Sequence, residues 1–328
     1  MAGETLRTPE IQSNTPEVLT PDKRPIVLLG AGSGLGAAIA ERFSIEGHTV
    51  YAGTRSPAKF EALRTRILTA GGAEPKPLIA DITKPAEFTE ALNNTGLQQG
   101  EPVHYFPVAA GGMENVNMLV ARQVVGLKRA IKRGASPDEL AEIAAVATQT
   151  IKEKVETEEV LAPARDINVK QPVEIYWQLQ EKGHFDKNSW VLNTSSSISN
   201  EFDPEHPERF RGPMFYLPVA LKEASVRILR QNAHGIGHNH LDAVAPELPD
   251  TAVGGFIDGL VDVMQAIQPD KKIEVPKTPT TLVADEIYKE IVYNPRQSPT
   301  KQRTLFIDEG YVGYKRPQRW DEPFLPYL

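Results

Sequence analysis

Short apolar segments alternate with longer amphipathic segments along most of the chain. The apolar segments predict strands at residues 26–30, 48–54, 76–81, 103–109, 189–195, 240–245 and 304–308. The intervening segments show the apolar spacing typical of helices, at residues 34–46, 57–70, 85–95, several stretches between 113 and 182, 218–233, 254–267 and 281–292. This alternation predicts an α/β fold, a Rossmann-type doubly wound parallel sheet with helices on both faces. Such sheets bind ligands beyond the carboxyl ends of their strands, so residues that follow strands are candidates for function.

One connection is longer than a single crossover helix needs. About 80 residues separate the strand ending near Ala109 from the one ending near Ser195. Within it, residues 113–160 have a helical pattern, and Ser136-Pro137-Asp138-Glu139 is typical of a helix start with proline at the first position. We therefore expect one domain at residues 25–312 with a helical insertion. An insertion that packs on the sheet or on a partner subunit is favoured over a cap above the active site.

Both ends of the chain differ from this domain. Residues 1–24 are rich in Thr, Pro, Glu and Ser and lack the basic start and apolar core of a secretory signal, so we expect a flexible arm. Residues 313–328 end in an aromatic and apolar run, which we expect to dock on the core or on a neighbouring subunit.

Composition narrows the setting and the partners. Of 328 residues, 40% are hydrophobic, which is enough for a full core, yet no apolar run reaches the roughly 18 residues that cross a membrane. The net charge of −7 argues against nucleic acid as a partner. The absence of cysteine excludes disulfides, thiolate metal sites and cysteine nucleophiles. We expect a cytoplasmic protein with neither a membrane nor a nucleic-acid partner.

Glycines follow the first predicted strand directly, in Gly30-Ala31-Gly32-Ser33-Gly34-Leu35-Gly36. The pattern predicts a strand, a tight turn and a helix N-terminus, whose free N–H groups and dipole would hold the pyrophosphate of a dinucleotide. In this arrangement Gly30 makes the turn, Gly34 lets the backbone approach the ligand, and Gly36 allows close contact between helix and strand.

The ends of the next two strands bear on the choice of cofactor. In NAD sites the second strand usually ends in an acid that holds the ribose hydroxyls, but this strand ends in Gly53-Thr54-Arg55. Because Arg55 can pair with a 2′-phosphate, NADP is favoured over NAD. Asp81 ends the third strand and is placed to reach the adenine.

With these pieces in order, residues 25–312 resemble the short-chain dehydrogenase/reductase family. The resemblance rests on the glycine motif, on Asp81, and on the segments Asp166-Ile167-Asn168-Val169-Lys170, Val191-Leu192-Asn193-Thr194-Ser195-Ser196, Ala245-Pro246-Glu247-Leu248-Pro249-Asp250-Thr251 and Phe306-Ile307-Asp308-Glu309-Gly310-Tyr311. It implies catalytic roles for Asn168, Ser196, Tyr216 and Lys222. It implies cofactor contacts at Gly30, Ser33, Gly34, Leu35, Gly36, Arg55, Asp81, Ile82, Ala110, Gly111, Lys222, Pro246 and Thr251.

The chain also departs from the family pattern. Val108-Ala109-Ala110-Gly111 replaces the family's Asn-Asn-Ala-Gly, and Glu247 replaces a glycine. The Tyr-x-x-x-Lys motif is missing, because the residue four before Lys222 is Pro218 and the nearest tyrosine, Tyr216, lies six before. Residues six apart on a helix point about 120° apart. A helix that starts near Pro218 would leave Tyr216 on the preceding loop, free to turn its hydroxyl inward.

The chemistry follows from where charge develops. Hydride transfer to a carbonyl carbon builds negative charge on oxygen, and Tyr216 would donate the proton it needs. Lys222 would lower the pKa of that phenol and hold the nicotinamide ribose. Ser196 would orient the substrate oxygen, and the resemblance implies that Asn168 holds a relay water.

We therefore predict an NADP-dependent oxidoreductase that reduces a carbonyl group of a small molecule, with a 3-oxoacyl thioester as one candidate. Enoyl reductases of this superfamily also lengthen the Tyr–Lys interval, so reduction of a conjugated C=C bond is one alternative. A non-catalytic NADP-binding scaffold or sensor is another, favoured by the displaced tyrosine. The resemblance further implies a homodimer or homotetramer.

Three histidines lie close together at His234, His238 and His240. They enter a strand at its N-terminal end, opposite the expected site, so we interpret them as structural and predict no metal.

Overall fold

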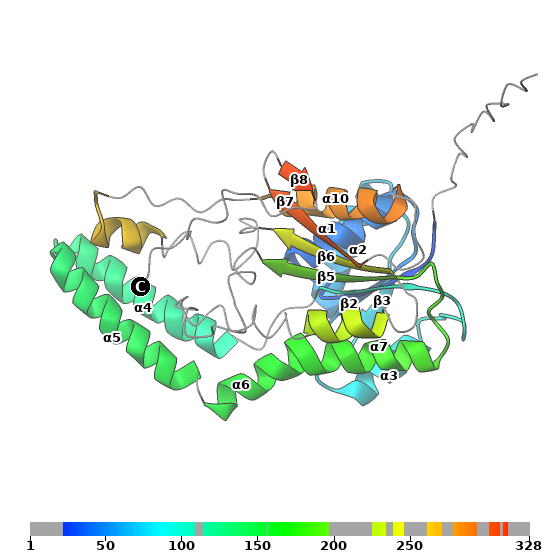
Figure 1. Ribbon diagram of the computed structural model, residues 1–328, viewed down its shortest axis with the longest axis horizontal. Coiled ribbons are helices and arrows are strands. Elements are labelled where there is room, and N and C mark those ends of the chain that lie inside the picture. Colours follow the sequence, from blue (N-terminus) through cyan, green and yellow to red (C-terminus); the bar gives the residue numbers. More distant parts are fainter. Residues whose placement is uncertain are drawn as a thin grey trace, which may run out of the picture.

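The computed structural model describes residues 22–108, 114–155, 157–196, 225–233, 239–245, 261–270, 278–293, 302–308 and 311–313. One sheet of eight strands forms the centre, in the order β3-β2-β1-β4-β5-β6-β7-β8 (Figure 1). The strands are β1 (Ile26–Leu29), β2 (Val50–Thr54), β3 (Lys76–Ile79), β4 (His104–Pro107), β5 (Trp190–Ser196), β6 (Asn239–Ala245), β7 (Gln302–Asp308) and β8 (Tyr311–Gly313). Strands β1 to β7 are parallel, and β8 pairs antiparallel with β7.

The helices follow the strands in alternation. They are α1 (Gly34–Ile45), α2 (Pro57–Thr69), α3 (Pro85–Asn93), α4 (Glu114–Lys132), α5 (Pro137–Val155), α6 (Glu158–Arg165), α7 (Gln171–Glu181) and α10 (Thr280–Val292), with a π-helical turn at Asp166–Lys170. Residues 225–233 and 261–267 are also helical. The predicted doubly wound α/β fold is confirmed. No helix among the residues that the structure describes has the length and apolar character of a membrane span.

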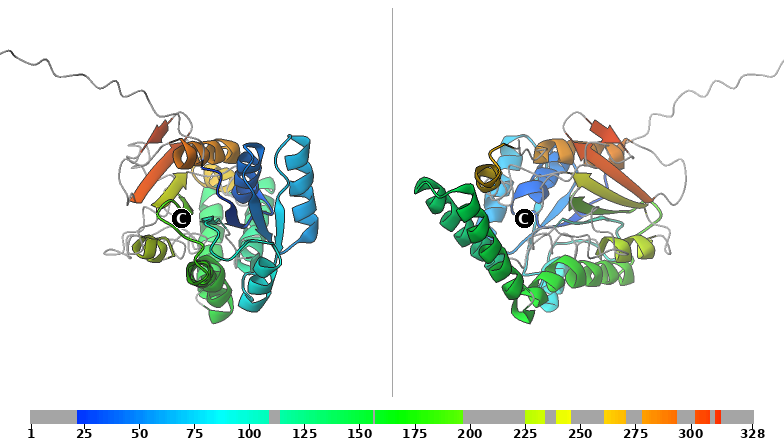
Figure 2. Two further views of the ribbon diagram at one scale, coloured as in Figure 1. Left: turned by 90° about the vertical axis from the view of Figure 1, so that its right-hand side faces the viewer. Right: turned by 60° about the vertical axis from the view of Figure 1, so that its left-hand side comes forward.

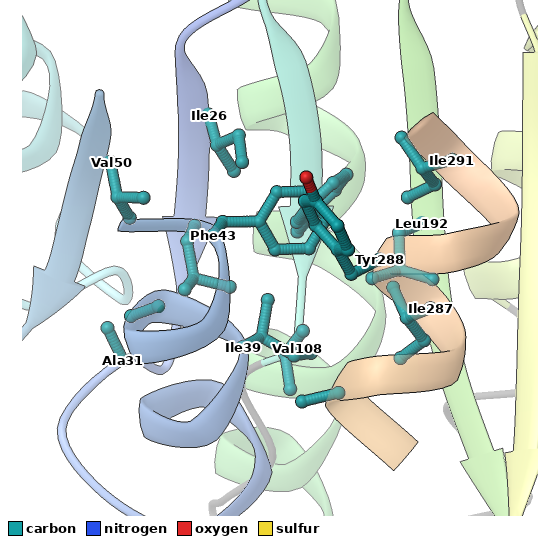
Figure 3. Close-up of a cluster of buried hydrophobic side chains, with 14 of the residues drawn as sticks. Ile26, Ala31, Ile39, Phe43, Val50, Val108, Leu192, Ile287, Tyr288 and Ile291 are labelled. Atoms are coloured by element: carbon teal, nitrogen blue, oxygen red, sulfur yellow. The ribbon is translucent and has the colours of Figure 1, made fainter. Parts of the chain in front are cut away.

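Each face of the sheet has its own core. Along β1, Ile26 and Leu28 point to one side, whereas Val27 and Leu29 point to the other, as alternation along a strand requires. On the first side α1, α2 and α10 contribute, with the rings of Phe43 and Tyr288 edge to face and 5.1 Å apart (Figure 3). The second side is covered by α3, α7 and helical residues 225–233. All of β1 is fully buried, which explains its unbroken apolar run.

Strand β1 lies between β2 and β4, so the chain winds outward from it in both directions. This is the switch point at which open α/β sheets bind ligands. The glycine turn that follows β1 is therefore positioned by the topology of the whole sheet.

The long connection after β4 contains the hairpin α4–α5. Its second helix begins at Pro137, as predicted, and Ser136 and Glu139 form a reciprocal cap: the Glu139 N–H donates to Ser136 Oγ (3.2 Å) and the Ser136 N–H to Glu139 Oε2 (3.0 Å). The hairpin extends away from the sheet, on the side toward which β5 and β6 point (Figures 1 and 2).

At the start of the described chain, Arg24 pairs with Asp186 at 2.8 Å. Most of the predicted N-terminal arm and of the 313–328 tail lies outside the described residues, so both remain predictions.

Candidate active site

The carboxyl ends of β1, β2 and β3 meet at one edge of the sheet. Leu29 is in register with Gly53, and Thr54 is in register with Ile79. The Ala80 N–H donates to the Thr54 carbonyl at 3.2 Å, which extends this pairing to the strand ends. The residues that follow the three strands, Gly30, Arg55 and Asp81, therefore lie along the same edge.

The glycine turn has the geometry that a dinucleotide site requires. Gly30 has φ of +85°, a value that side chains disfavour. A β-carbon on Gly36 would lie 2.1 Å from the Gly30 carbonyl oxygen, so only glycine lets α1 come this close to the turn. The Gly30 and Ala31 N–H groups both donate to the Gly53 carbonyl, at 3.0 and 2.9 Å, and fix the turn against β2.

The N-terminus of α1 has no side-chain cap. Ser33 is the N-cap residue, but its side chain makes no capping hydrogen bond, and the first turn contains no acidic residue. The N–H groups of Gly34, Leu35 and Gly36 have no carbonyl four residues earlier within the helix to bind. They and the positive end of the helix dipole suit an anion, so the turn fits the pyrophosphate of a dinucleotide.

Two cationic residues lie near the end of β2. Arg55 is exposed, directly after the strand. A β-carbon on Gly32 would lie 2.7 Å from Thr54 Oγ1 and 3.3 Å from Lys59 Cδ, so the Lys59 side chain runs beside the glycine turn. Lys59 was not among the site residues predicted from the sequence. Its position in the sequence could have indicated this role. Lys59 lies in the first turn of α2, shortly after the end of β2, and this turn brings it back toward the strand end.

Asp81 is fixed and charged. Its Oδ1 accepts hydrogen bonds from the Thr83 N–H (3.0 Å) and hydroxyl (2.8 Å). Burial alone would raise the pKa of Asp81, but these hydrogen bonds and the charge of Arg55 outweigh it and hold the pKa below its usual value. Next to it, the Ile82 carbonyl lies 2.9 Å from the Gln171 amide nitrogen when that amide is oriented to donate.

Asn168 lies in the π-helical turn between α6 and α7 and is almost fully buried. Its amide donates to the Ala164 carbonyl at 2.8 Å. The helix that follows is fixed to the sheet, since Tyr105 on β4 donates its hydroxyl proton to the Pro172 carbonyl at 2.8 Å. Together with the Gln171–Ile82 contact, this places the Asn168 segment near the edge that carries Asp81. Single π-helical turns often occur at functional sites.

Ser196 is the last residue of β5, in register with Ala245 at the end of β6. Both strands therefore end at the same edge as the glycine turn. His240 lies further back on β6, opposite Val191, and is fully buried. The other predicted residues, Ala110, Gly111, Tyr216, Lys222, Pro246 and Thr251, lie outside the described part of the chain, as do His234 and His238.

Comparison with known proteins agrees with this geometry. Residues 24–133 match the sequence model of the short chain dehydrogenase family. No curated protein matches the chain by sequence.

Several solved structures share the fold. An angucycline C-6 ketoreductase, LanV, with bound NADP has a TM-score of 0.54 at 15% identity, covering 87% of this chain and 93% of its own. An alcohol dehydrogenase from the archaeon Thermococcus sibiricus, complexed with 5-hydroxy-NADP, has a TM-score of 0.52 at 16% identity and covers 90% and 99%. A 3-oxoacyl-[acyl-carrier protein] reductase from Brucella melitensis with bound NAD has a TM-score of 0.50 at 16% identity and covers 93% and 96%.

At these identities the structural likeness establishes the fold, and the sequence match covers residues 24–133, about a third of the chain. Residues 24–133 are therefore similar to the short-chain dehydrogenase family, and the chain shares the fold of these solved structures.

Proposed function

We propose that this protein is an NADP-dependent reductase that transfers hydride to a carbonyl group of a small molecule. The observation that carries the proposal is the cationic edge at the glycine turn. Arg55 and Lys59 border this turn, the strand before them ends without an acid, and the helix N-terminus beside them is uncapped.

The preference for NADP rests on local charge rather than on the similar structures, which include complexes with NADP or its 5-hydroxy derivative and a complex with NAD. The 2′-phosphate of NADP would pair with Arg55, and Lys59 would add a second charge. Asp81 would accept a hydrogen bond from the adenine amino group, because its carboxylate is ionised and already oriented by Thr83. The pyrophosphate would rest on the N–H groups of Gly34, Leu35 and Gly36.

Bound NADPH would supply the hydride, and the protein would manage the proton. Tyr216 would donate a proton to the substrate oxygen as negative charge develops there. Lys222 would favour the phenolate and so lower the pKa of Tyr216 toward neutrality. Ser196, at the end of β5, would hold the substrate oxygen by a hydrogen bond. Asn168 would hold the water through which Lys222 is reprotonated.

The first experiment tests the cofactor site. Titrations of NADPH and NADH against wild type and Arg55→Ala should show at least roughly tenfold weaker NADPH binding in the variant, because a charge-assisted phosphate contact is lost, with NADH binding unchanged. Lys76→Ala is the matched control, since Lys76 is exposed at the start of β3, far along the strand from the site. Equal losses for both cofactors would contradict the assignment of Arg55.

The second experiment tests the chemistry. Wild type should oxidise NADPH in the presence of a 3-oxoacyl thioester and give the 3-hydroxy product, and Tyr216→Phe should lower kcat by about a hundredfold or more. The control is Tyr293→Phe: Tyr293 contacts Tyr288, whose ring faces His48 at the opposite edge of the sheet. A saturated product from a 2-enoyl thioester would instead identify an enoyl reductase. NADPH binding without turnover of any carbonyl or enoyl substrate would favour a scaffold.

A further inference from the structure

One side of the hairpin α4–α5, its inner side, is buried within the protein. Its buried residues face inward at helical spacing: Val124, Leu127 and Ala130 on α4, and Leu140, Ala144 and Ala147 on α5. Helical residues 261–267 lie beside the hairpin (Figure 1), where Lys128 pairs with Asp262 at 2.9 Å and Val263 and Met264 are buried. The inner side therefore needs no further partner.

The outer side exposes large apolar side chains. Met118 and Val125 on α4 are 54% and 47% exposed, and Ile143 and Val146 on α5 are 38% and 65% exposed. Apolar residues at this spacing on two adjacent helices are costly to leave in water and are typical of a surface that another protein covers.

The outer face of α4 is basic. Arg122, Arg129, Lys132 and Arg133 are exposed and follow Met118 and Val125 at intervals of three and four residues, so all six lie on one face. None of these four cations forms an ion pair with a carboxylate of the described chain. Such a face is unusual on a chain whose net charge is −7.

The outer face of α5 is acidic. Asp138, Glu139, Glu142 and Glu153 are exposed and share a face with Val146. Acids in the first turn of α5 and bases in the last turn of α4 also suit the helix dipoles. The dipoles do not account for Arg122, Met118 or Val146, which lie well away from those turns.

The two faces match in register. Residues of α4 and α5 that are equally far along the chain from the centre of the connecting turn match in chemical type. These pairs are Arg129 with Glu142, Lys132 with Glu139, and Val125 with Val146. Because both helices rise by 1.5 Å per residue, each of these pairs lies at one height along the hairpin. A second hairpin placed alongside with its turn at the same end brings base to acid and apolar to apolar, with α4 antiparallel to α5 of the other copy.

We propose that the outer face of the hairpin is a self-association surface, where α4 of one copy packs against α5 of a second copy. The occupant is a second copy because this chain itself carries both complementary faces in matching register. The charged pairs set the partner and the register, whereas the apolar side chains between them supply most of the free energy.

Charge reversal tests the proposal. One variant, Arg122→Glu with Arg129→Glu, makes both outer faces acidic, and another, Glu142→Arg with Glu153→Arg, makes both basic. Sedimentation over a range of protein concentrations should show association of the wild type. Each variant alone should dissociate at least roughly tenfold more readily, because like charges then face each other. Mixing the two variants should restore association in a one-to-one ratio.

The control is Lys76→Glu with Lys187→Glu, which changes the net charge as the first variant does but at exposed positions outside the hairpin, and it should sediment like the wild type. Circular dichroism and thermal unfolding establish that every variant is folded. A wild type that stays monomeric overturns the proposal. So do variants that associate as the wild type does, and variants that lose association but do not recover it on mixing, since these outcomes assign the face to another partner or to none.

Discussion

The amide of Asn193 and the ring of His240 lie 2.9 Å apart between β5 and β6, both inaccessible to solvent. With the Asn193 amide nitrogen facing His240 Nε2, that ring nitrogen accepts the hydrogen bond, and the proton of the neutral ring is on Nδ1. That nitrogen faces Asp242 Oδ1 at 3.5 Å, and Asp242 is itself paired with Arg230 of the helix at residues 225–233. The network joins β5, β6 and that helix.

The stability of the protein should therefore depend on pH through His240. Burial, and then the charge of Arg230, lower the pKa of His240 to about 3, whereas the unfolded chain binds this proton near pH 6.5. Because the unfolded state binds more protons between these values, His240 contributes its full stability above pH 6.5 and loses it as the pH falls toward 3. The expected loss from pH 7 to pH 5 is about 2 kcal/mol.

Urea unfolding at the two pH values measures this loss, and His240→Gln is the comparison. Glutamine can still accept the hydrogen bond from Asn193 but does not titrate, so the variant should lose about 2 kcal/mol less than the wild type between pH 7 and pH 5. Parallel pH profiles would show that another group is responsible.

Gly36 should not tolerate a side chain. Its β-carbon would lie 2.1 Å from a backbone oxygen that cannot move aside cheaply, so Gly36→Ala should lower the free energy of unfolding by about 2 kcal/mol and abolish measurable NADPH binding. Gly126→Ala is a matched control, since a β-carbon there meets nothing within 4 Å. In the middle of α4 that change should stabilise by roughly 0.5–1 kcal/mol. Equal effects of the two substitutions would contradict the assigned role of Gly36.

The reciprocal cap at the start of α5 should contribute measurably. In Ser136→Ala the Glu139 N–H loses its acceptor, so thermal or urea unfolding should show a loss of about 1 kcal/mol. Ser56→Ala removes the equivalent acceptor for the Lys59 N–H at the start of α2 and should cost a similar amount. If Ser136→Ala is neutral while Ser56→Ala is not, the hairpin unfolds separately from the sheet.

Most of the fold was predictable because most helices and strands have a local signal in the sequence. The run from Ile26 to Leu29 is apolar throughout because it is buried on both faces, and Pro137 after Ser136 marks a helix start. The positions of Gly30, Arg55 and Asp81 along one edge followed from parallel pairing alone. The short strand β8 was not predicted, since its three residues carry no periodic signal and depend on pairing with β7.

Contacts between residues that are far apart in the chain could not be predicted from the sequence. No pattern in the sequence indicates that Gln171 meets Ile82 or that Asn193 meets His240, because these partners are far apart in the chain. The catalytic assignments of Tyr216, Lys222, Ser196 and Asn168 stay predictions of the resemblance.

Lys59 is where the structure adds most to the cofactor site, and its role can be tested separately from that of Arg55. Lys59 runs beside Gly32 and forms no ion pair within the described ranges, so its ammonium group is available to a phosphate. Lys59→Ala should weaken NADPH binding roughly fivefold and leave NADH binding unchanged, because a solvent-exposed phosphate contact contributes about 1 kcal/mol. Lys59→Arg should retain the preference for NADPH. If Lys59→Ala weakens NADH equally, the residue supports the turn by contact of its aliphatic chain with Gly32, and the 2′-phosphate is held by Arg55 alone.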